Sequence, residues 1–164
     1  MAALEAGRKA PEILLPTTNG GKFSLAAALE RGPVLAAFFK ISCPVCQLAA
    51  PYLDRISKAY GNGRVTLVGV SQNSREDTLA FMKEFGVTFP VALDPESSYP
   101  ASNAYGLTNV PSLFLIEPDG KIALSSVGWV KAEIDDVNAR IARAAGKPKA
   151  AIFDGNSVPE WKAG

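Results

Sequence analysis

Cys43 and Cys46 are the only cysteines in the chain, and two residues separate them in the stretch KISCPVCQLAAP. This spacing lets both sulfur atoms meet within the first turn of a helix, where one thiol can attack a disulfide and the other can resolve the mixed disulfide that forms. A structural crosslink across so short a loop would restrain the unfolded chain very little. The pair is therefore interpreted as a redox switch, with Cys43 as the nucleophile and Cys46 as the resolving thiol.

The flanking sequence predicts how this pair is held. Apolar residues 34–39 indicate a buried strand that runs into the cysteine loop, and the apolar periodicity of residues 45–60 indicates a helix after it. Pro44 has the φ angle preferred at the first helical position, which makes Cys43 the predicted N-cap residue. Unpaired backbone N–H groups and the helix dipole stabilise a thiolate at that position, and this favours Cys43 as the attacking group.

The rest of the chain alternates strand-like and helix-like segments. Parallel strands joined by helices need right-handed crossovers, which predicts a central sheet with helices on both faces and a site at the carboxyl ends of its strands. Further elements are expected at residues 65–70 (strand), 74–85 (helix), 89–94 (strand), 101–105 (short helix), 112–128 (hairpin) and 131–145 (helix). The helix at 74–85 is expected to present Leu79, Met82 and Phe85 on one face.

Composition excludes several kinds of site and partner. The chain has no histidine, which excludes His-dependent catalytic triads and His-ligated zinc or haem, and two thiols are too few for an iron–sulfur cluster. We expect no cofactor and no metal. The net charge is +1 and both signs are scattered, so neither nucleic acid nor a membrane is an expected partner. The length fits a single domain over residues 1–164, in which 147–164 form an extended tail.

Two segments resemble the active site of the thioredoxin superfamily. In FFKISCPVCQLAAPYL a strand runs into a C-x-x-C pair, and Pro51 holds the place of the proline that follows the second cysteine by five residues. In NVPSLFLI, Pro111 matches the cis-proline that precedes the strand opposite the cysteine loop. Over roughly residues 7–145 the chain resembles the redoxin branch, which includes AhpC/TSA proteins and thiol-disulfide oxidoreductases of the TlpA and ResA kind.

The resemblance implies a fold, a substrate edge and a class of partner. The fold is α/β and thioredoxin-like, a central mixed β-sheet flanked by helices, with an N-terminal extension. The backbone of the residue before the cis-proline pairs with a substrate peptide in this superfamily. The implied substrate-binding residues are Pro44, Val45, Val110 and Pro111. The implied partners are protein thiols or disulfides, or a small thiol reductant.

Three positions near the cysteines depart from thioredoxin itself or could modulate the thiols. Ser42 stands where a tryptophan usually precedes the first cysteine, and the buried aspartate of the preceding strand is replaced by the apolar stretch around Ala37. That aspartate assists proton transfer to and from the buried thiol. Lys40 and Ser42 are therefore interpreted as modulating residues, with Lys40 either a nearby cation or simply a solvated lysine at the strand end.

A peroxiredoxin-type thiol peroxidase is the first alternative. Peroxiredoxins carry P-x-x-x-[ST]-x-x-C around the reactive cysteine. Counted back from Cys43, the hydroxyl and proline positions hold Lys40 and Ala36; counted back from Cys46, they hold Cys43 and Phe39. Neither cysteine fits this motif, so a thiol-disulfide oxidoreductase is favoured.

A second alternative is a Cu(I)-binding or noncatalytic thioredoxin-fold module, because two soft thiolates can hold Cu(I). Oligomeric state is not predicted. The first residues contain no apolar run long enough for a signal peptide. A cytoplasmic location is expected for the chain as written, and a periplasmic one if an export signal precedes it in the natural protein.

Overall fold

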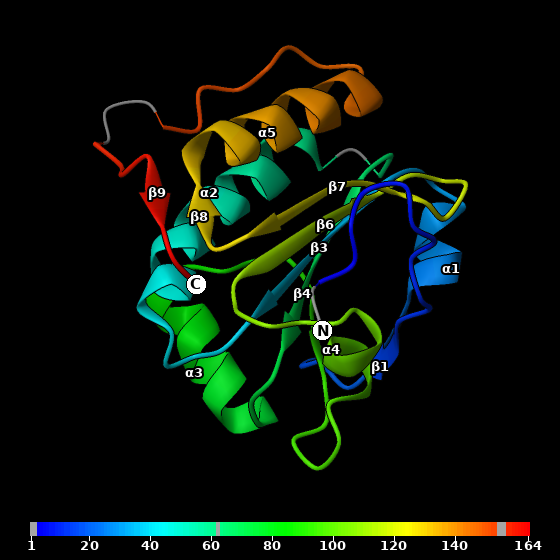
Figure 1. The fold of residues 1–164 in the computed structure, drawn as a ribbon, viewed down its shortest axis with the longest axis vertical. Helices are drawn as coiled ribbons and strands as arrows, with labels where there is room; N and C mark the ends of the chain where they lie inside the picture. Colours follow the sequence, from blue (N-terminus) through cyan, green and yellow to red (C-terminus); the bar gives the residue numbers. More distant parts are fainter. Residues whose placement is uncertain (1–2, 62, 154–156) are drawn as a thin grey trace.

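A mixed β-sheet forms the centre of the structure, a computed structural model that describes residues 3–61, 63–153 and 157–164 (Figure 1). In spatial order its strands are β5 (Val91–Leu93), β4 (Thr66–Ser71), β3 (Val34–Phe39), β6 (Ser112–Ile116) and β7 (Ile122–Val127). β3, β4 and β5 run parallel to one another. β6 runs antiparallel to β3, and β7 runs antiparallel to β6. Every residue of β3 is buried, because this strand lies in the middle of a sheet that is covered on both faces.

The side chains of β3 alternate between two hydrophobic cores, one on each face of the sheet. Its odd-numbered residues point into a core shared with three helices, and its even-numbered residues point into a core closed by the N-terminal extension and two short helices. The first group comprises α2 (Pro44–Tyr60), α3 (Arg75–Phe85) and α5 (Lys131–Ala145), and the second α1 (Leu25–Leu29) and α4 (Pro100–Ala104). The predicted central mixed sheet flanked by helices is confirmed.

One detail of the helix packing differs from the sequence prediction. The hairpin formed by β6 and β7 is confirmed, and so is α5. Met82 and Phe85 pack against the core, as the sequence predicts. Leu79 lies outside this face, because it is 37% exposed whereas Thr78 and Phe81 are buried. The Thr78 hydroxyl lies 2.7 Å from the Ser71 hydroxyl, and the Phe81 ring stacks on Phe39. Thr78 and Phe81 therefore take the place on the inner face that the apolar pattern gave to Leu79.

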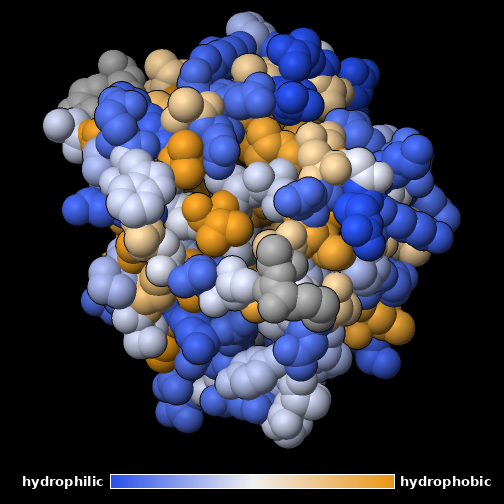
Figure 2. All heavy atoms as spheres, in the orientation of Figure 1, coloured by the Kyte–Doolittle hydropathy of each residue, from blue (hydrophilic) through white to orange (hydrophobic). Residues whose placement is uncertain are grey.

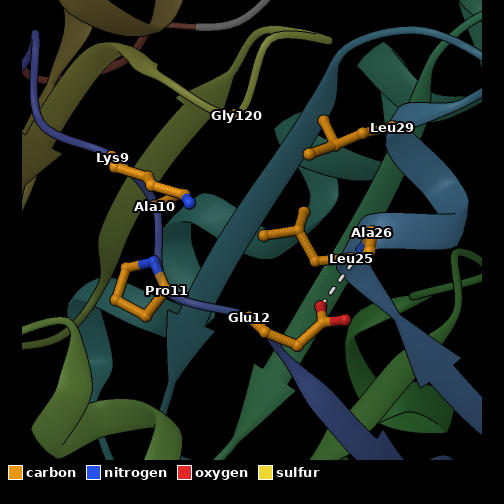
Figure 3. Close-up of a pocket in the computed structure, with 8 residues that line it drawn as sticks. All are labelled: Lys9, Ala10, Pro11, Glu12, Leu25, Ala26, Leu29 and Gly120. Atoms are coloured by element: carbon orange, nitrogen blue, oxygen red, sulfur yellow. Dashed lines mark hydrogen bonds between the residues drawn. The ribbon is translucent and has the colours of Figure 1, made fainter.

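The N-terminal extension forms a small hairpin of β1 (Leu14–Pro16) and β2 (Lys22–Ser24). The Glu12 carboxylate accepts hydrogen bonds from the Ile13 and Ala26 N–H groups, which ties the extension to the start of α1. A pocket of about 520 Å³ lies between the two (Figure 3). Leu25 and Leu29 line one side and Lys9 the other, with Glu12 directed at α1. The sequence pattern predicted neither the hairpin nor the pocket.

The C-terminal tail is attached to the body of the protein at several points. Asn138 is fully buried in α5, where its amide accepts from the Tyr60 hydroxyl and donates to the Ala150 carbonyl. The Ala150 N–H donates in turn to the Tyr60 oxygen. Further along, β9 (Trp161–Lys162) pairs antiparallel with β8 (Trp129–Val130). The tail is therefore attached to α5 through Ala150 and to β8 through β9.

The described part of the face shown in Figure 2 carries no large continuous apolar area. On the face shown in Figure 2, hydrophobic side chains lie in small separate groups between charged and polar ones. Among the described residues, no helix has the length and apolar character needed to cross a membrane. Scattered apolar residues of this kind are ordinary on a protein surface.

We expect Asn138→Ala to lower the free energy of unfolding by about 1–3 kcal/mol, because it removes the acceptor of the Tyr60 hydroxyl hydrogen and one of the two donors to the Ala150 carbonyl in a buried place. Urea denaturation followed by fluorescence measures this. Asn103→Ala is the control, since its exposed side chain bonds only to the Ser98 carbonyl; we expect a change of about 0.5 kcal/mol or less. Equal losses in both variants would contradict a special role for the buried cluster.

Candidate functional site

Cys43 occupies the N-cap position of α2, as the sequence predicts. Its backbone is extended, with φ −86° and ψ 114°, and Pro44 begins the helix. The Cys43 sulfur accepts a hydrogen bond from the Cys46 N–H at 3.2 Å. This N–H is one of the groups that a helix leaves unpaired at its first turn, so negative charge on the Cys43 sulfur would be stabilised here.

Side chains from two other elements hold the cysteine loop in place. The Gln47 side chain donates to the Ile41 carbonyl at 3.0 Å, and the Ile41 N–H donates to the Asn73 side-chain oxygen at 3.0 Å. Asn73 follows β4, and its own N–H donates to the Ser71 hydroxyl. Sequence reasoning missed these residues; the two amide residues directly after the apolar run of β4, Gln72 and Asn73, are the signal that could have indicated Asn73.

The loop before β6 lies directly opposite Cys43. The Val110–Pro111 peptide bond is cis. The Cys43 thiol donates to the Val110 carbonyl oxygen across 3.4 Å, although the two residues are 67 positions apart. Pro111 also lines the small cavity behind Cys46. The structure thus brings together four of the residues proposed from the sequence: Cys43, Cys46, Val110 and Pro111.

Cys46 lies in very different surroundings from Cys43. It is only 2% exposed, whereas Cys43 is partly open to solvent. It borders a cavity of about 20 Å³ whose other lining residues are all apolar, among them Ala37, Phe39 and Phe89. Burial, and after it the hydrogen bond with Cys43, raises the pKa of the Cys46 thiol far above its ordinary range. Ala37, which is expected to stand where thioredoxin has a buried aspartate, lines the same cavity as Cys46.

The remaining predicted residues lie at the rim of the site. Lys40, Ser42 and Pro44 are exposed, and Val45 is half-buried. Lys40 and Val110 line a pocket of about 230 Å³ together with polar residues, namely Gln72, Tyr99, Ser102, Asn103, Thr108 and Asn109. Within residues 3–61, 63–153 and 157–164, no group of three or more His, Cys, Asp or Glu side chains is placed to hold a metal ion.

Comparison with known proteins decides the family. Residues 6–125 match the model of the AhpC/TSA family. The chain belongs to the AhpC/TSA family. In sequence it is 33% identical over 123 residues to the thiol-disulfide oxidoreductase ResA of Bacillus subtilis, an alignment that spans 73% of this chain and 66% of that protein.

Two solved structures show how widely this AhpC/TSA fold is shared. A Chlorobium tepidum protein assigned as thiol:disulfide interchange protein DsbE superposes with a TM-score of 0.76 and 27% identity, covering 88% of this chain and 100% of that one. Peroxidoxin BcpB from Mycobacterium tuberculosis superposes with a TM-score of 0.69 at 18% identity, covering 87% and 97%, a likeness of fold alone.

The comparisons confirm the predicted branch, a redoxin of the thioredoxin superfamily that is similar to ResA. They support the predicted enzyme class, a thiol-disulfide oxidoreductase. Protein thiols and disulfides are, in general terms, the substrates of that class. The roles of the individual cysteines are a separate matter.

The difference in burial predicts selective alkylation. In the reduced protein at pH 7–9 we expect iodoacetamide to modify Cys43 at least about tenfold faster than Cys46, because the buried thiol is both inaccessible and protonated. Peptide mapping by mass spectrometry measures the two rates. In Cys43→Ser, labelling of Cys46 should remain slow; rapid labelling there would contradict the apolar environment described for it.

Proposed function

We propose that this AhpC/TSA protein exchanges disulfides with protein or small-molecule thiols, with Cys43 as the attacking thiol and Cys46 as the resolving thiol. The observation that supports this division most directly is the contrast between the two sulfur atoms. The Cys43 sulfur is partly exposed, accepts a helix N-terminal N–H and faces the Val110 carbonyl. The Cys46 sulfur is buried against apolar side chains.

The proposed reaction with a substrate disulfide has two steps. The Cys43 thiolate attacks one substrate sulfur, a Cys43–substrate disulfide forms, and the other substrate sulfur leaves as a thiolate that takes up a proton. Cys46 then loses its proton and attacks the Cys43 sulfur, which forms the Cys43–Cys46 disulfide and releases the second substrate thiol. Two electrons pass from the dithiol to the substrate, and the reverse sequence oxidises a substrate dithiol.

A peptide substrate would bind along the loop before β6. The backbone of Val110 lies next to the Cys43 sulfur, and an extended peptide paired with it would present its own sulfur to Cys43. Pro44 and Val45 follow Cys43 at the start of α2 and would contact the residues that flank the substrate cysteine. Lys40 is placed beside Val110 in the polar pocket, where it would act on substrates through its charge.

Redox titration tests the proposal. Equilibration with glutathione buffers and thiol trapping should reveal one reversible transition that involves both cysteines, and Cys43→Ser should abolish it. The same samples should consume hydrogen peroxide slowly, since neither cysteine has the peroxiredoxin hydroxyl group ahead of it. Fast, saturable peroxide consumption that depends on Cys43 would favour the peroxidase alternative instead. Cu(I) retention without any redox transition would favour a binding module.

The pKa of Cys46 predicts how the second step depends on pH. Below the raised pKa, the thiolate fraction of Cys46 increases tenfold with each pH unit, so the resolving step should accelerate by about tenfold per unit between pH 6 and pH 9. Thionitrobenzoate bound to Cys43 reports this step when it is released. Cys46→Ser should hold the adduct indefinitely, and a pH-independent release in the wild-type protein would contradict the assignment of Cys46.

A further inference from the structure

The end of the C-terminal tail lies against the loop that carries the proposed substrate edge. Residues 161–164 are here called the end segment. Its first two residues form β9, which pairs with β8, and its last residue, Gly164, reaches this loop. The Asn109 side chain donates to the Gly164 carbonyl at 3.1 Å. A Cβ atom at Gly164 would lie 2.6 Å from the Val110 carbonyl oxygen and 3.3 Å from Asn109 Cβ. The Gly164 backbone therefore sits directly on Val110.

This contact concerns the same carbonyl group that faces Cys43. The Val110 oxygen accepts from the Cys43 thiol, and Gly164 packs against it without a side chain between them. A peptide that paired with Val110 would need space for its own backbone beside this carbonyl, because neighbouring strands lie about 4.8 Å apart. In the structure, the end segment occupies the space beside the Val110 carbonyl that the backbone of such a peptide would need.

We infer that the end segment is a specificity-determining element, which an extended peptide must displace to pair with Val110 but which a small disulfide can pass. This inference rests on the proposed exchange at Cys43. A peptide would react only during the fraction of time in which the edge is free, and its apparent rate constant would fall by that fraction. A small disulfide needs only the Cys43 sulfur, which is partly exposed.

The attachments of the tail allow the end segment to move by itself. Two backbone-anchored contacts precede it: Trp129 Nε1 donates to the Pro159 carbonyl at 2.6 Å, and the Lys131 N–H donates to the Glu160 carbonyl at 3.0 Å. The end segment itself is exposed along its whole length, and Trp161 is 64% exposed. A short exposed strand with little buried apolar surface opens at low cost in free energy.

The test compares two probes that release the same leaving group. One is an unstructured peptide whose single cysteine carries thionitrobenzoate, and the other is cysteamine that carries thionitrobenzoate. Each is mixed with the reduced protein, and the second-order rate constant for thionitrobenzoate release is measured. Deletion of residues 161–164 retains Pro159 and Glu160 with their bonds. We expect this deletion to raise the peptide rate constant about five- to tenfold and to change the cysteamine rate constant less than about twofold.

Two substitutions separate displacement of the end segment from damage to the fold. Gly164→Ala places a methyl group where it collides with the Val110 carbonyl, so the end segment must shift and the peptide reaction should accelerate as in the deletion. Trp161→Ala removes an exposed indole but keeps the β9 backbone pairing and Gly164, so both rate constants should stay within about twofold of wild type.

The outcomes divide clearly. A selective gain with the peptide in the deletion and in Gly164→Ala supports the inference. It is overturned by equal changes for both probes, by unchanged or slower peptide reaction in the deletion, or by a gain in Trp161→Ala that matches Gly164→Ala. Failure of the proposed function looks different, because neither probe would then react with the wild-type protein in a way that depends on Cys43.

Discussion

The Cys43 sulfur joins two parts of the chain, and the site depends on its two hydrogen bonds. One comes from the first turn of α2 and the other goes to the Val110 carbonyl, 67 residues further along. Both partners are in place because β3 and β6 are neighbours in the sheet, with Phe38 paired to Ser112. This register puts the end of β3, and so the cysteine loop, beside the residues that precede β6. A shift of one residue would turn every side chain of β6 to the other face and separate the two loops.

The same arrangement makes two chemically identical side chains different. The N-cap position gives the Cys43 sulfur a hydrogen-bond donor and access to solvent, whereas Cys46, three residues further in the first turn of α2, lies in the core between β3 and α3. Burial among these apolar side chains disfavours the charged thiolate, and it is the largest cause of the raised pKa of Cys46. With Ala37 in place of a carboxylate, no acidic side chain is among the residues that line the cavity beside Cys46. An attacking and a resolving thiol thus follow from position on one helix.

The C-terminal tail contacts α5 at its beginning and the loop around Val110 at its end. The bonds among Tyr60, Asn138 and Ala150 hold its beginning, and the pairing of β9 with β8 carries its end to the loop around Val110. Tyr60 and Asn138 are buried, whereas the end segment is exposed. A strongly held base with a weakly held end is the arrangement expected of an element that opens locally while the domain stays folded.

The sequence by itself determined the elements whose signals are local. The apolar run of β3, the proline after Cys43, the stripe of α5 and the Asp-Gly turn each depend on a few neighbouring residues, and each predicted its element correctly. The cysteine spacing and Pro111 carried the resemblance to the family. Contacts between distant segments were decided only by the tertiary structure. The burial of Thr78 and Phe81 on α3 depends on their contacts with Ser71 and Phe39. The packing of Gly164 on Val110 depends on how the tail returns past α5. Local sequence patterns do not predict such partners, because hydrogen bonds and close packing between remote residues arise only when the whole chain has folded.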